Sequence, residues 1–396
     1  MEFSKKEEKM ANQEMTRSGG LVQNLSGELA YFSFKPSPLP PVPPLQIDSQ
    51  TLALLVEANR KVAFLDAISE KIPNLNLFLS MYIRKEALVS SQIEGTQCTL
   101  DDVLDPSVRQ NANIDVGEVI NYISATDFAL KRLDDLPLCA RLLKETHAIL
   151  INEGRGSDKT PGKFRTSQNW IGGQGSSLKN ARYIPPNVED MKAALTDLEK
   201  YMNSNDSLDP LVQAALIHYQ FETIHPFLDG NGRIGRLLIT LFLIHKKIIS
   251  KPVLYISCFL KINRVEYYDR LGEVRKNGNY EQWVSFFLQM ILQTANDAIE
   301  SINALEALHK KNLSLIEALP IRARENALVL FEYIERKAIV DTTLTARELG
   351  LSYNTTAKNI ELLRALKILS PSSKSGKASL YSYTEYLDIL RKGTEL

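Results

Sequence analysis

One short segment of the chain, residues 225–236, has the residue types and spacing to hold a phosphate group. It reads His-Pro-Phe-Leu-Asp-Gly-Asn-Gly-Arg-Ile-Gly-Arg. The backbone N–H groups of Gly230 to Gly232 can point inward at the start of a helix, where the helix dipole also attracts an anion. Arg233 and Arg236 are three residues apart, so both would project from one helical face beside those N–H groups. The segment therefore predicts a phosphate site.

Two other side chains of this segment could act on a bound phosphate. His225 precedes the glycines, and the ordinary pKa of an imidazole suits removal of a proton from an attacking hydroxyl. Asp229 offers the hard oxygen ligand that Mg²⁺ prefers where it bridges phosphates. Together they predict transfer of a phosphate-containing group. The alternative is a glycine-rich turn between helices, with solvated arginines and a capping aspartate.

The elements that must position this segment are helices. Apolar residues recur at spacings of three and four from about residue 48 to about residue 311. The predicted helices are 51–72, 75–94, 117–133, 139–152, 187–203, 209–221 and 233–248. The phosphate segment lies between the last two. Segment 168–186 differs, because two short extended pieces flank a Gly/Ser-rich tip, and this pattern predicts a β-hairpin that could serve as a lid or clamp.

The beginning of the chain lacks helical periodicity. Residues 1–30 are polar and show no repeat, which predicts a mobile tail. Residues 35–44 form a proline-rich run, which predicts an extended polyproline arm. Such an arm either lies on its own domain, which is the favoured interpretation, or binds an SH3-like domain.

The end of the chain changes character at about residue 320. Predicted helices over 324–337, 345–351 and 353–366, followed by a hairpin over 372–383, are typical of a winged helix-turn-helix. The candidate recognition helix carries side chains that suit contacts in a DNA groove: Asn354, Thr355, Thr356, Lys358 and Asn359. Lys and Arg only slightly outnumber Asp and Glu here. DNA binding and protein docking are therefore equally open.

Composition bounds the class of protein. A length of 396 residues predicts two or three domains, and 44% hydrophobic with 24% charged residues is ordinary for a globular protein. A formal net charge of zero excludes a basic field over the whole protein that would attract nucleic acid. Cys98, Cys139 and Cys258 have neither metal-site nor disulfide spacing. With no apolar leader or long apolar run, we expect a cytoplasmic protein without a membrane anchor.

The phosphate segment resembles the signature of a known family. It matches the Fic family motif, H-P-F-x-[D/E]-G-N-G-R-x-x-R, at every specified position. Residues 75–96 resemble the region that precedes many Fic cores, and residues 255–268 resemble the segment after the motif. In all, residues 45–300 look like Fic. The expected fold is mainly α, a Fic-type helical core with one β-hairpin flap, followed by a C-terminal winged helix-turn-helix domain.

This resemblance implies a division of the chain into four parts. We expect a flexible tail over 1–30 and an N-terminal helical region with an inhibitory motif over 31–110. The catalytic core would span 111–300. A linker helix and the winged-helix domain would occupy 301–396.

The resemblance also implies an activity and its site. The protein would be an adenylyltransferase that moves AMP from ATP, with Mg²⁺, to a Ser, Thr or Tyr hydroxyl of a target protein. His225 would be the general base, and Asp229 would hold Mg²⁺. The nucleotide would contact Glu94, Gly230, Asn231, Gly232, Arg233 and Arg236, with flap residues Asn180, Ala181, Arg182 and Tyr183 and adenine-pocket residues Tyr267 and Tyr268. Paired tyrosines on an apolar helix are equally typical of plain core.

A second motif lies upstream of the core. Ser90, Glu94 and Gly95 match the inhibitory pattern [S/T]-x-x-x-E-[G/N] known before some Fic cores. Ser90 and Glu94 are four residues apart and so share a helical face. By resemblance, Glu94 would pair with Arg236 and occupy the position of the γ-phosphate, and in some relatives it activates water to remove AMP. The alternative is a solvated glutamate at a helix end.

Other classes of function stay open at this point. The retained Gly230 and Gly232 favour AMP transfer over the phosphotransferase branch of the family. The rival class is a DNA-binding regulator whose Fic core senses nucleotide, and a third is a toxin-like module. His147, His218, His245 and His309 lack a partner at ligand spacing, so packing or surface positions are expected for them. A homodimer is a possible assembly.

Overall fold

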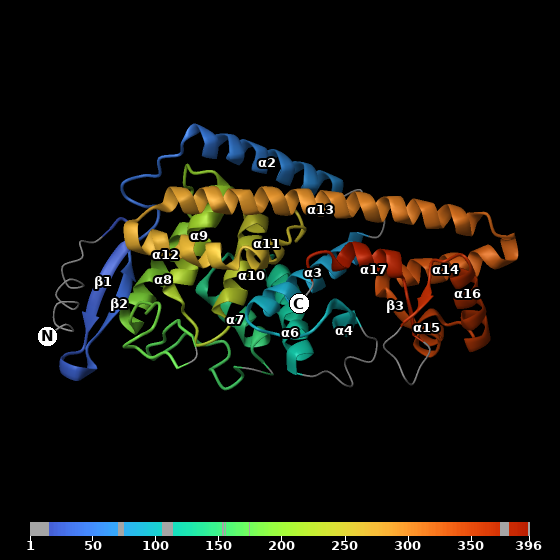
Figure 1. Cartoon of the computed structure of the whole chain (residues 1–396), viewed down its shortest axis with the longest axis horizontal. Coiled ribbons are helices and arrows are strands. Elements are labelled where there is room, and N and C mark those ends of the chain that lie inside the picture. The colour runs from blue at the N-terminus through green and yellow to red at the C-terminus, as the bar shows by residue number, and fades with distance from the viewer. Residues whose placement is uncertain are drawn as a thin grey trace.

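The computed structural model describes residues 16–394 apart from 70–74, 105–113, 153, 155, 174 and 373–379. In this part the chain is mainly helical, and its strands are short. Figure 1 shows an elongated molecule with a β-hairpin at one end and the C-terminal elements at the other. Within the described ranges, no helix is both long and apolar enough to cross a membrane. The predicted mainly α fold class is confirmed.

Two buried helices form the centre of the larger half. Helix α9 (Pro210–Ile224) is buried on all sides, and α10 (Asn231–His245) packs against it. Asp209 caps α9 by accepting a hydrogen bond from the N–H of Leu211 at 2.8 Å, and Pro210 takes the first helical position, where its missing N–H costs nothing. The phosphate segment, residues 225–236, therefore comprises the loop between two core helices and the beginning of α10.

The remaining helices of this half pack around α9 and α10. They are α3 (Leu75–Ile93), α4 (Leu100–Leu104), α6 (Ile114–Arg132), α7 (Ala140–Leu150), α8 (Val188–Met202), α11 (Ile256–Ile262) and α12 (Arg264–Asn277). The predicted helices over 75–94, 117–133, 139–152 and 187–203 agree with α3, α6, α7 and α8 within a few residues. Asn187 caps α8 by accepting from the N–H of Asp190 at 2.9 Å.

A long helix connects the two ends of the molecule. Helix α13 (Tyr280–Glu317) has 38 residues, which corresponds to about 57 Å. Helix α2 (Ser49–Ser69) lies along its first half (Figure 1). The domain boundary expected at residue 300 therefore falls inside a continuous helix. The boundary expected at residue 110 lies outside the described residues.

An antiparallel β-hairpin occupies the N-terminal end. Strands β1 (Gly19–Asn24) and β2 (Tyr31–Pro36) pair from Gly19 opposite Pro36 to Asn24 opposite Tyr31, and a short 3₁₀ turn, η1 (Gly27–Leu29), joins them. The predicted unstructured tail is thus wrong for residues 19–24, while residues 1–15 lie outside the described part. Contacts to distant segments hold the hairpin: the Ser18 hydroxyl donates to the Val274 carbonyl at 2.7 Å, and the Phe34 N–H donates to the Ile184 carbonyl at 3.0 Å.

The proline-rich run continues from β2 along the same domain. The Gln220 side chain donates to the Ser37 carbonyl at 2.9 Å, and Arg17 donates to the Pro43 carbonyl at 3.3 Å. Leu39 and Leu45 pack against the core. The run therefore lies on its own domain, as the favoured interpretation predicted.

The hairpin predicted over residues 168–186 as the flap contains one isolated antiparallel β-bridge, between Ile171 and Tyr183. Ile171 and Tyr183 exchange backbone hydrogen bonds of 2.8 and 3.1 Å, and no longer strand forms in the described residues of 168–186. The hairpin prediction is therefore correct for the pairing partner and wrong for the length. Glycine and serine at the tip leave no β-forming residues to extend the ladder.

The C-terminal elements form a small unit. They are α14 (Ile321–Lys337), β3 (Ile339–Asp341), α15 (Thr342–Leu349), α16 (Tyr353–Ala365), β4 (Ser370–Pro371), β5 (Leu380–Ser382) and α17 (Thr384–Arg391), with the sheet order β3-β5-β4. Two of the proposed groove contacts are wrong: Thr356 and Asn359 are buried and bond to the carbonyls of Ser352 and Thr355.

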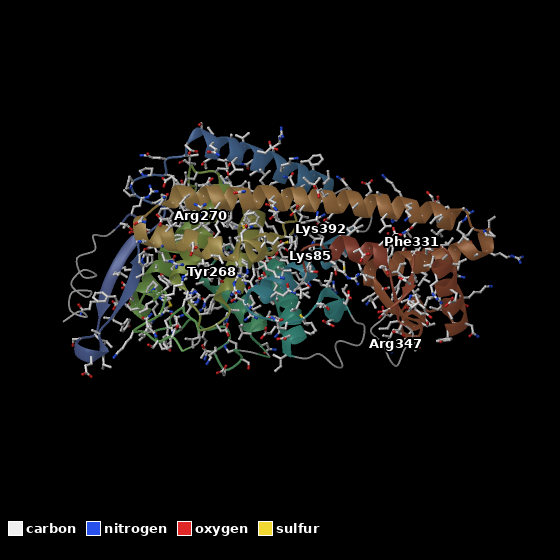
Figure 2. The ribbon with its side chains drawn as sticks, in the orientation of Figure 1. Lys85, Tyr268, Arg270, Phe331, Arg347 and Lys392 are labelled. Carbon is white, nitrogen blue, oxygen red and sulfur yellow. The ribbon has the colours of Figure 1, made fainter. Side chains whose placement is uncertain are left out.

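Helix α17 returns from this unit to the larger half. It contacts α13 and α3, and Figure 2 labels Lys85 of α3 and Lys392 beyond α17 in the middle of the molecule. Arg391 and Asp101 form an ion pair of 2.8 Å. The side-chain amide of Gln92, two residues before Glu94, donates to the carbonyl of Thr394 at 3.3 Å. The end of the chain is thereby in contact with the helix that precedes Glu94.

Candidate active site

A cavity of about 910 Å³ opens beside the connection between α9 and α10. Its walls come from α9, α10, α12, the loop around residues 170–184 and the N-terminal hairpin. Predicted site residues that line it are Glu94, Ala181, Arg182, Tyr183, His225, Asp229, Gly232, Arg236, Tyr267 and Tyr268. The hairpin contributes Gly20, Leu21, Phe32 and Phe34, which the sequence did not indicate. Residues far apart in the chain thus converge on one chamber.

The backbone of the connecting loop has two left-handed residues. His225 ends α9 with φ 50°, and Gly230 begins α10 with φ 75°. Phe227 lies between these two residues, and its backbone N–H and carbonyl both bond to the Asn231 side chain at 2.8 Å. The side chain of Asn231 therefore braces the loop, which leaves its backbone N–H as the group that can meet a phosphate.

His147 supports the same loop from α7. Its ring stacks on Phe227 with centroids 3.8 Å apart, Nε2 lies 3.0 Å from the Asp229 carbonyl, and Nδ1 accepts from the N–H of Gly162 at 2.9 Å. Burial lowers the pKa of His147 to about 4, so it is neutral and Nε2 carries the proton. The predicted packing position of this histidine is confirmed.

Arg165 is a support that the sequence did not reveal. It is 1% exposed, and its guanidinium donates to the carbonyls of His225 at 3.0 Å, Ser167 at 3.2 Å and Ile224 at 3.4 Å, and also to Pro186. Burial lowers its pKa to about 10. A lone arginine in a loop carries no pattern that separates it from a solvated one. In the structure it fixes the carbonyls around the left-handed turn at His225.

We expect Arg165→Leu to lower the free energy of unfolding by about 3 kcal/mol, because several buried carbonyls would lose their donor at once. Urea denaturation followed by circular dichroism measures the change. Arg141→Leu is the matched control, since Arg141 lies on the surface of α7, and it should change stability by no more than about 0.5 kcal/mol. A loss below 1 kcal/mol for Arg165→Leu would contradict this role.

His225 stands at the entrance to the phosphate cradle. Its pKa is lowered to about 4, mainly by burial and in part by the positive charges of Arg165 and Arg275, while the Glu222 backbone and Glu94 act in the opposite direction. The imidazole is therefore neutral at pH 7 and able to accept a proton. It is the histidine of the described residues that lines the cavity.

The phosphate cradle is predicted at the start of α10. The first N–H groups of this helix have no helical acceptor, and Gly232 lines the cavity. Arg233 is buried, with its guanidinium 3.6 Å from the Asp229 carboxylate. Arg236, one turn further, is 1% exposed and reaches the cavity. Gly232 and Arg236 therefore line the cavity together, whereas Gly230, Asn231 and Arg233 do not line it.

Asp229 is placed where a metal ligand for bound phosphates would be needed. Its side chain is 41% exposed and lines the cavity beside the cradle. Among the residues that the structure describes, no group of three or more His, Cys, Asp or Glu could hold a metal by itself. A single carboxylate fits Mg²⁺, which takes most of its ligands from phosphate and water.

Glu94 contacts Arg236 directly. The Arg236 guanidinium donates to Glu94 Oε1 at 2.7 Å, to the Ser90 hydroxyl at 2.8 Å and to the Ser90 carbonyl at 2.9 Å. A Cβ on Gly232 would lie 2.4 Å from Glu94 Oε1, so the glycine leaves the space that the carboxylate fills. The contact expected between Glu94 and Arg236 is therefore present.

The electrostatics of this pair favour its ionised form. Burial would raise the pKa of Glu94, but the charge and hydrogen bond of Arg236 outweigh burial and hold that pKa below its usual value. The Glu94 side chain is 38% exposed. The pair is therefore worth less than the ~3–5 kcal/mol that breaking a fully buried pair costs. A multiply charged ligand could compete with such a contact.

The flap and tyrosine predictions have mixed outcomes. Tyr183 donates to the Thr223 carbonyl at 2.7 Å and lies under Arg275, so it is fixed. Asn180 does not line the cavity, because its side chain accepts from the Ser177 N–H at 2.7 Å and caps the loop tip.

The two tyrosines predicted at the adenine pocket differ in burial. Tyr267 is buried and hydrogen-bonded to His218 at 2.9 Å, whereas Tyr268 is half-buried on α12 (Figure 2).

Comparison with known proteins identifies related sequences. Residues 137–243 match the model of the Fic/DOC family, and residues 52–131 match that of the Fic/DOC family N-terminal region. The protein adenylyltransferase fic-1 of Caenorhabditis briggsae is 32% identical over 134 residues, covering 31% of this chain and 24% of that protein. The protein adenylyltransferase Fic of Drosophila sechellia is 30% identical over 229 residues, covering 54% of this chain and 43% of that protein.

The chain thus spans less than half the length of these curated relatives. Among solved structures, a Fic family protein from Desulfovibrio desulfuricans G20 matches 86% of this chain and 97% of its own, with a TM-score of 0.56 and 20% identity. This likeness shows a shared fold.

Proposed function

Through residues 52–131 and 137–243 the chain belongs to the Fic/DOC family, and on this premise we propose that it is a protein adenylyltransferase. It transfers AMP from ATP to a hydroxyl side chain of a target protein. The observation that carries the proposal is the shared cavity, which His225 lines together with Gly232 and Arg236 of α10.

The triphosphate of ATP binds at the start of α10 in this proposal. The N–H groups of Gly230, Asn231 and Gly232 hold the α- and β-phosphates, with Arg233 behind them. Arg236 holds the γ-phosphate. Asp229 would hold Mg²⁺, which neutralises phosphate charge and orients the chain of phosphates. Tyr268, and the edge of Tyr267, line the space for adenine.

The chemical step needs one base. The neutral imidazole of His225 takes the proton from the target hydroxyl, whose oxygen attacks the α-phosphorus of ATP. The new bond joins this oxygen to phosphorus, the bond to the bridging oxygen breaks, and pyrophosphate leaves. Arg182 and Tyr183 form the nearby wall that would hold the target backbone as an added strand.

Glu94 is a brake in this proposal. With Arg236 held by Glu94, the γ-phosphate cannot take its productive position, so the α-phosphorus is out of line for attack. Removal of AMP from the target by the same Glu94 stays a prediction. DNA binding by the C-terminal unit and a homodimer also stay predictions, and burial of Thr356 and Asn359 weakens the case for DNA.

We expect a target or the chain itself to acquire label from α-³²P-ATP and none from γ-³²P-ATP. The reason is that the α-phosphate stays on the acceptor while the γ-phosphate leaves with pyrophosphate. The experiment uses both labelled nucleotides with the Glu94→Gly variant and gel autoradiography. Label from γ-³²P-ATP would mean phosphate transfer, and label from neither nucleotide would contradict the proposal.

A further inference from the structure

A buried carboxyl group in the cavity has no role in the reaction just described. Glu222 lies on α9, three residues before His225, and is 7% exposed. It lines the cavity, and among the described residues its Oε1 atom has no hydrogen-bond partner. Leaving a buried polar atom unpaired costs about 1–3 kcal/mol, and such atoms are rare in folded proteins. A ligand donor in the cavity would remove this cost.

The position of Glu222 is fixed by a close approach to α10. A Cβ on Gly235 would lie 2.2 Å from Glu222 Oε1, so the absence of a side chain there makes room for the carboxyl. Gly235 is next to Arg236, and Gly232, one turn earlier, similarly makes room for Glu94. Gly232 and Gly235 are three residues apart, so the two carboxyl groups lie at neighbouring positions on one face of α10.

Glu222 lies one turn after His218, whose ring contacts the Tyr267 hydroxyl at 2.9 Å, and its carboxyl abuts Gly235, the neighbour of Arg236. The charge of Arg236 acts on it from the phosphate end, where it lowers the pKa of Glu222. Glu222 in turn raises the pKa of Tyr267 and of Tyr268 at the adenine end, a smaller cause there than burial. Burial dominates at Glu222 itself and raises its pKa to about 7.

The order of phosphate, ribose and base in a nucleotide indicates which group would lie beside the Glu222 carboxyl. Ribose stands between the phosphates and the base, and its hydroxyl groups are the donors at that level. We propose that Glu222 is a specificity-determining residue that accepts a hydrogen bond from a ribose hydroxyl of the bound nucleotide. The assignment rests on the proposed function, because it takes the phosphate and adenine positions from it. It explains a buried oxygen that the protein leaves unpaired.

Nucleotide binding tests the assignment without relying on catalysis. Isothermal titration calorimetry with Mg²⁺ measures the Kd of the full chain for ATP, 2′-deoxy-ATP and 3′-deoxy-ATP. We expect one of the deoxy analogues to bind about 10- to 100-fold more weakly than ATP, because a site built to bind a hydroxyl rejects the analogue that lacks it. Glu222→Ala should bind ATP and that analogue equally.

Variants keep the test independent of folding. Glu222→Met fills the volume without an acceptor and should also lose the preference, whereas Glu222→Gln retains an acceptor oxygen and should keep it. Gln220→Leu is the matched control on the same helix. Gln220 is 2% exposed with an unpaired amide oxygen in the described part, but it does not line the cavity, so this variant should keep the preference.

Two outcomes would overturn the assignment alone. Equal affinity of the unmodified chain for all three nucleotides would show that no ribose hydroxyl is recognised, and an unchanged preference in Glu222→Ala and Glu222→Met would assign recognition to another group. Either result leaves the adenylyltransferase proposal standing. Failure of the unmodified chain to bind any of the three nucleotides would overturn the proposed function and this assignment together.

Discussion

Replacing Glu94 by glycine is expected to raise the rate of labelling with α-³²P-ATP about 10²-fold, the scale on which misplacement of a reacting group by about 1 Å acts. The physical reason is the 2.7 Å contact between Glu94 Oε1 and the Arg236 guanidinium. Without that carboxylate, Arg236 is released to the γ-phosphate, and the α-phosphorus can align with the acceptor hydroxyl. Initial rates of incorporation at saturating ATP give the comparison.

A matched variant separates this effect from the loss of any glutamate at a helix end. Glu317 is the last residue of α13 and is exposed, far from the cavity, so Glu317→Gly should leave labelling unchanged. Glu94→Gln keeps the shape but removes the charge and should give a smaller increase than Glu94→Gly. Equal labelling of the unmodified chain and Glu94→Gly would rule out the brake.

The second large effect concerns the base. In the Glu94→Gly background, His225→Ala should lower transfer by about 10²- to 10⁴-fold, the usual contribution of general base catalysis. Affinity for ATP should change little, since the phosphates are held by α10. His245→Ala is the control, because His245 lies at the far end of α10 and outside the cavity. Transfer that survives His225→Ala would exclude this histidine as the base.

The pH dependence of kcat/KM tests His225 as the base, because it shows on which side of the profile activity is lost. A general base works only when it is unprotonated, and burial lowers the pKa of His225 to about 4. Activity of Glu94→Gly should therefore persist below pH 6.5 and be lost as the pH falls towards 4. The negative charge of Glu94 raises the pKa of His225, so the Glu94→Gly change should lower this pKa and extend activity to lower pH. An acidic limb centred near 6.5 would contradict a buried base.

Local patterns in the sequence were sufficient for the central helices. Apolar spacing located α9 and α10, and Asp209 with Pro210 marked the start of α9. The same patterns placed the phosphate segment between these helices, and helical spacing put Ser90 and Glu94 on one face. The contact of Glu94 with Arg236, about 140 residues away, was expected from family resemblance rather than from spacing, and the contact of Ser90 with Arg236 was not expected.

The features that sequence reasoning missed depend on distant contacts. Strand β1 begins with two glycines and shows no alternation of apolar and polar residues, and the hairpin that it forms with β2 is held by bonds to Val274 and Ile184. Arg165 and His147 act through backbone carbonyls, which any residue supplies, so no pairing of residue types could reveal them. Glu222 looked like one more polar residue on a helix until the close approach of Gly235 showed where its carboxyl lies.

The hydrogen bond between Gln92 and Thr394 joins the end of the chain to the segment that precedes Glu94. Gln92 lies between Ser90 and Glu94, and its amide group holds the carbonyls of Cys98 and Thr394 while accepting from Lys261. The bond to Thr394 joins positions 302 residues apart. The last described residues of the chain and the turn that presents Glu94 are therefore joined through one side chain, so a displacement at either side of this contact would disturb the other.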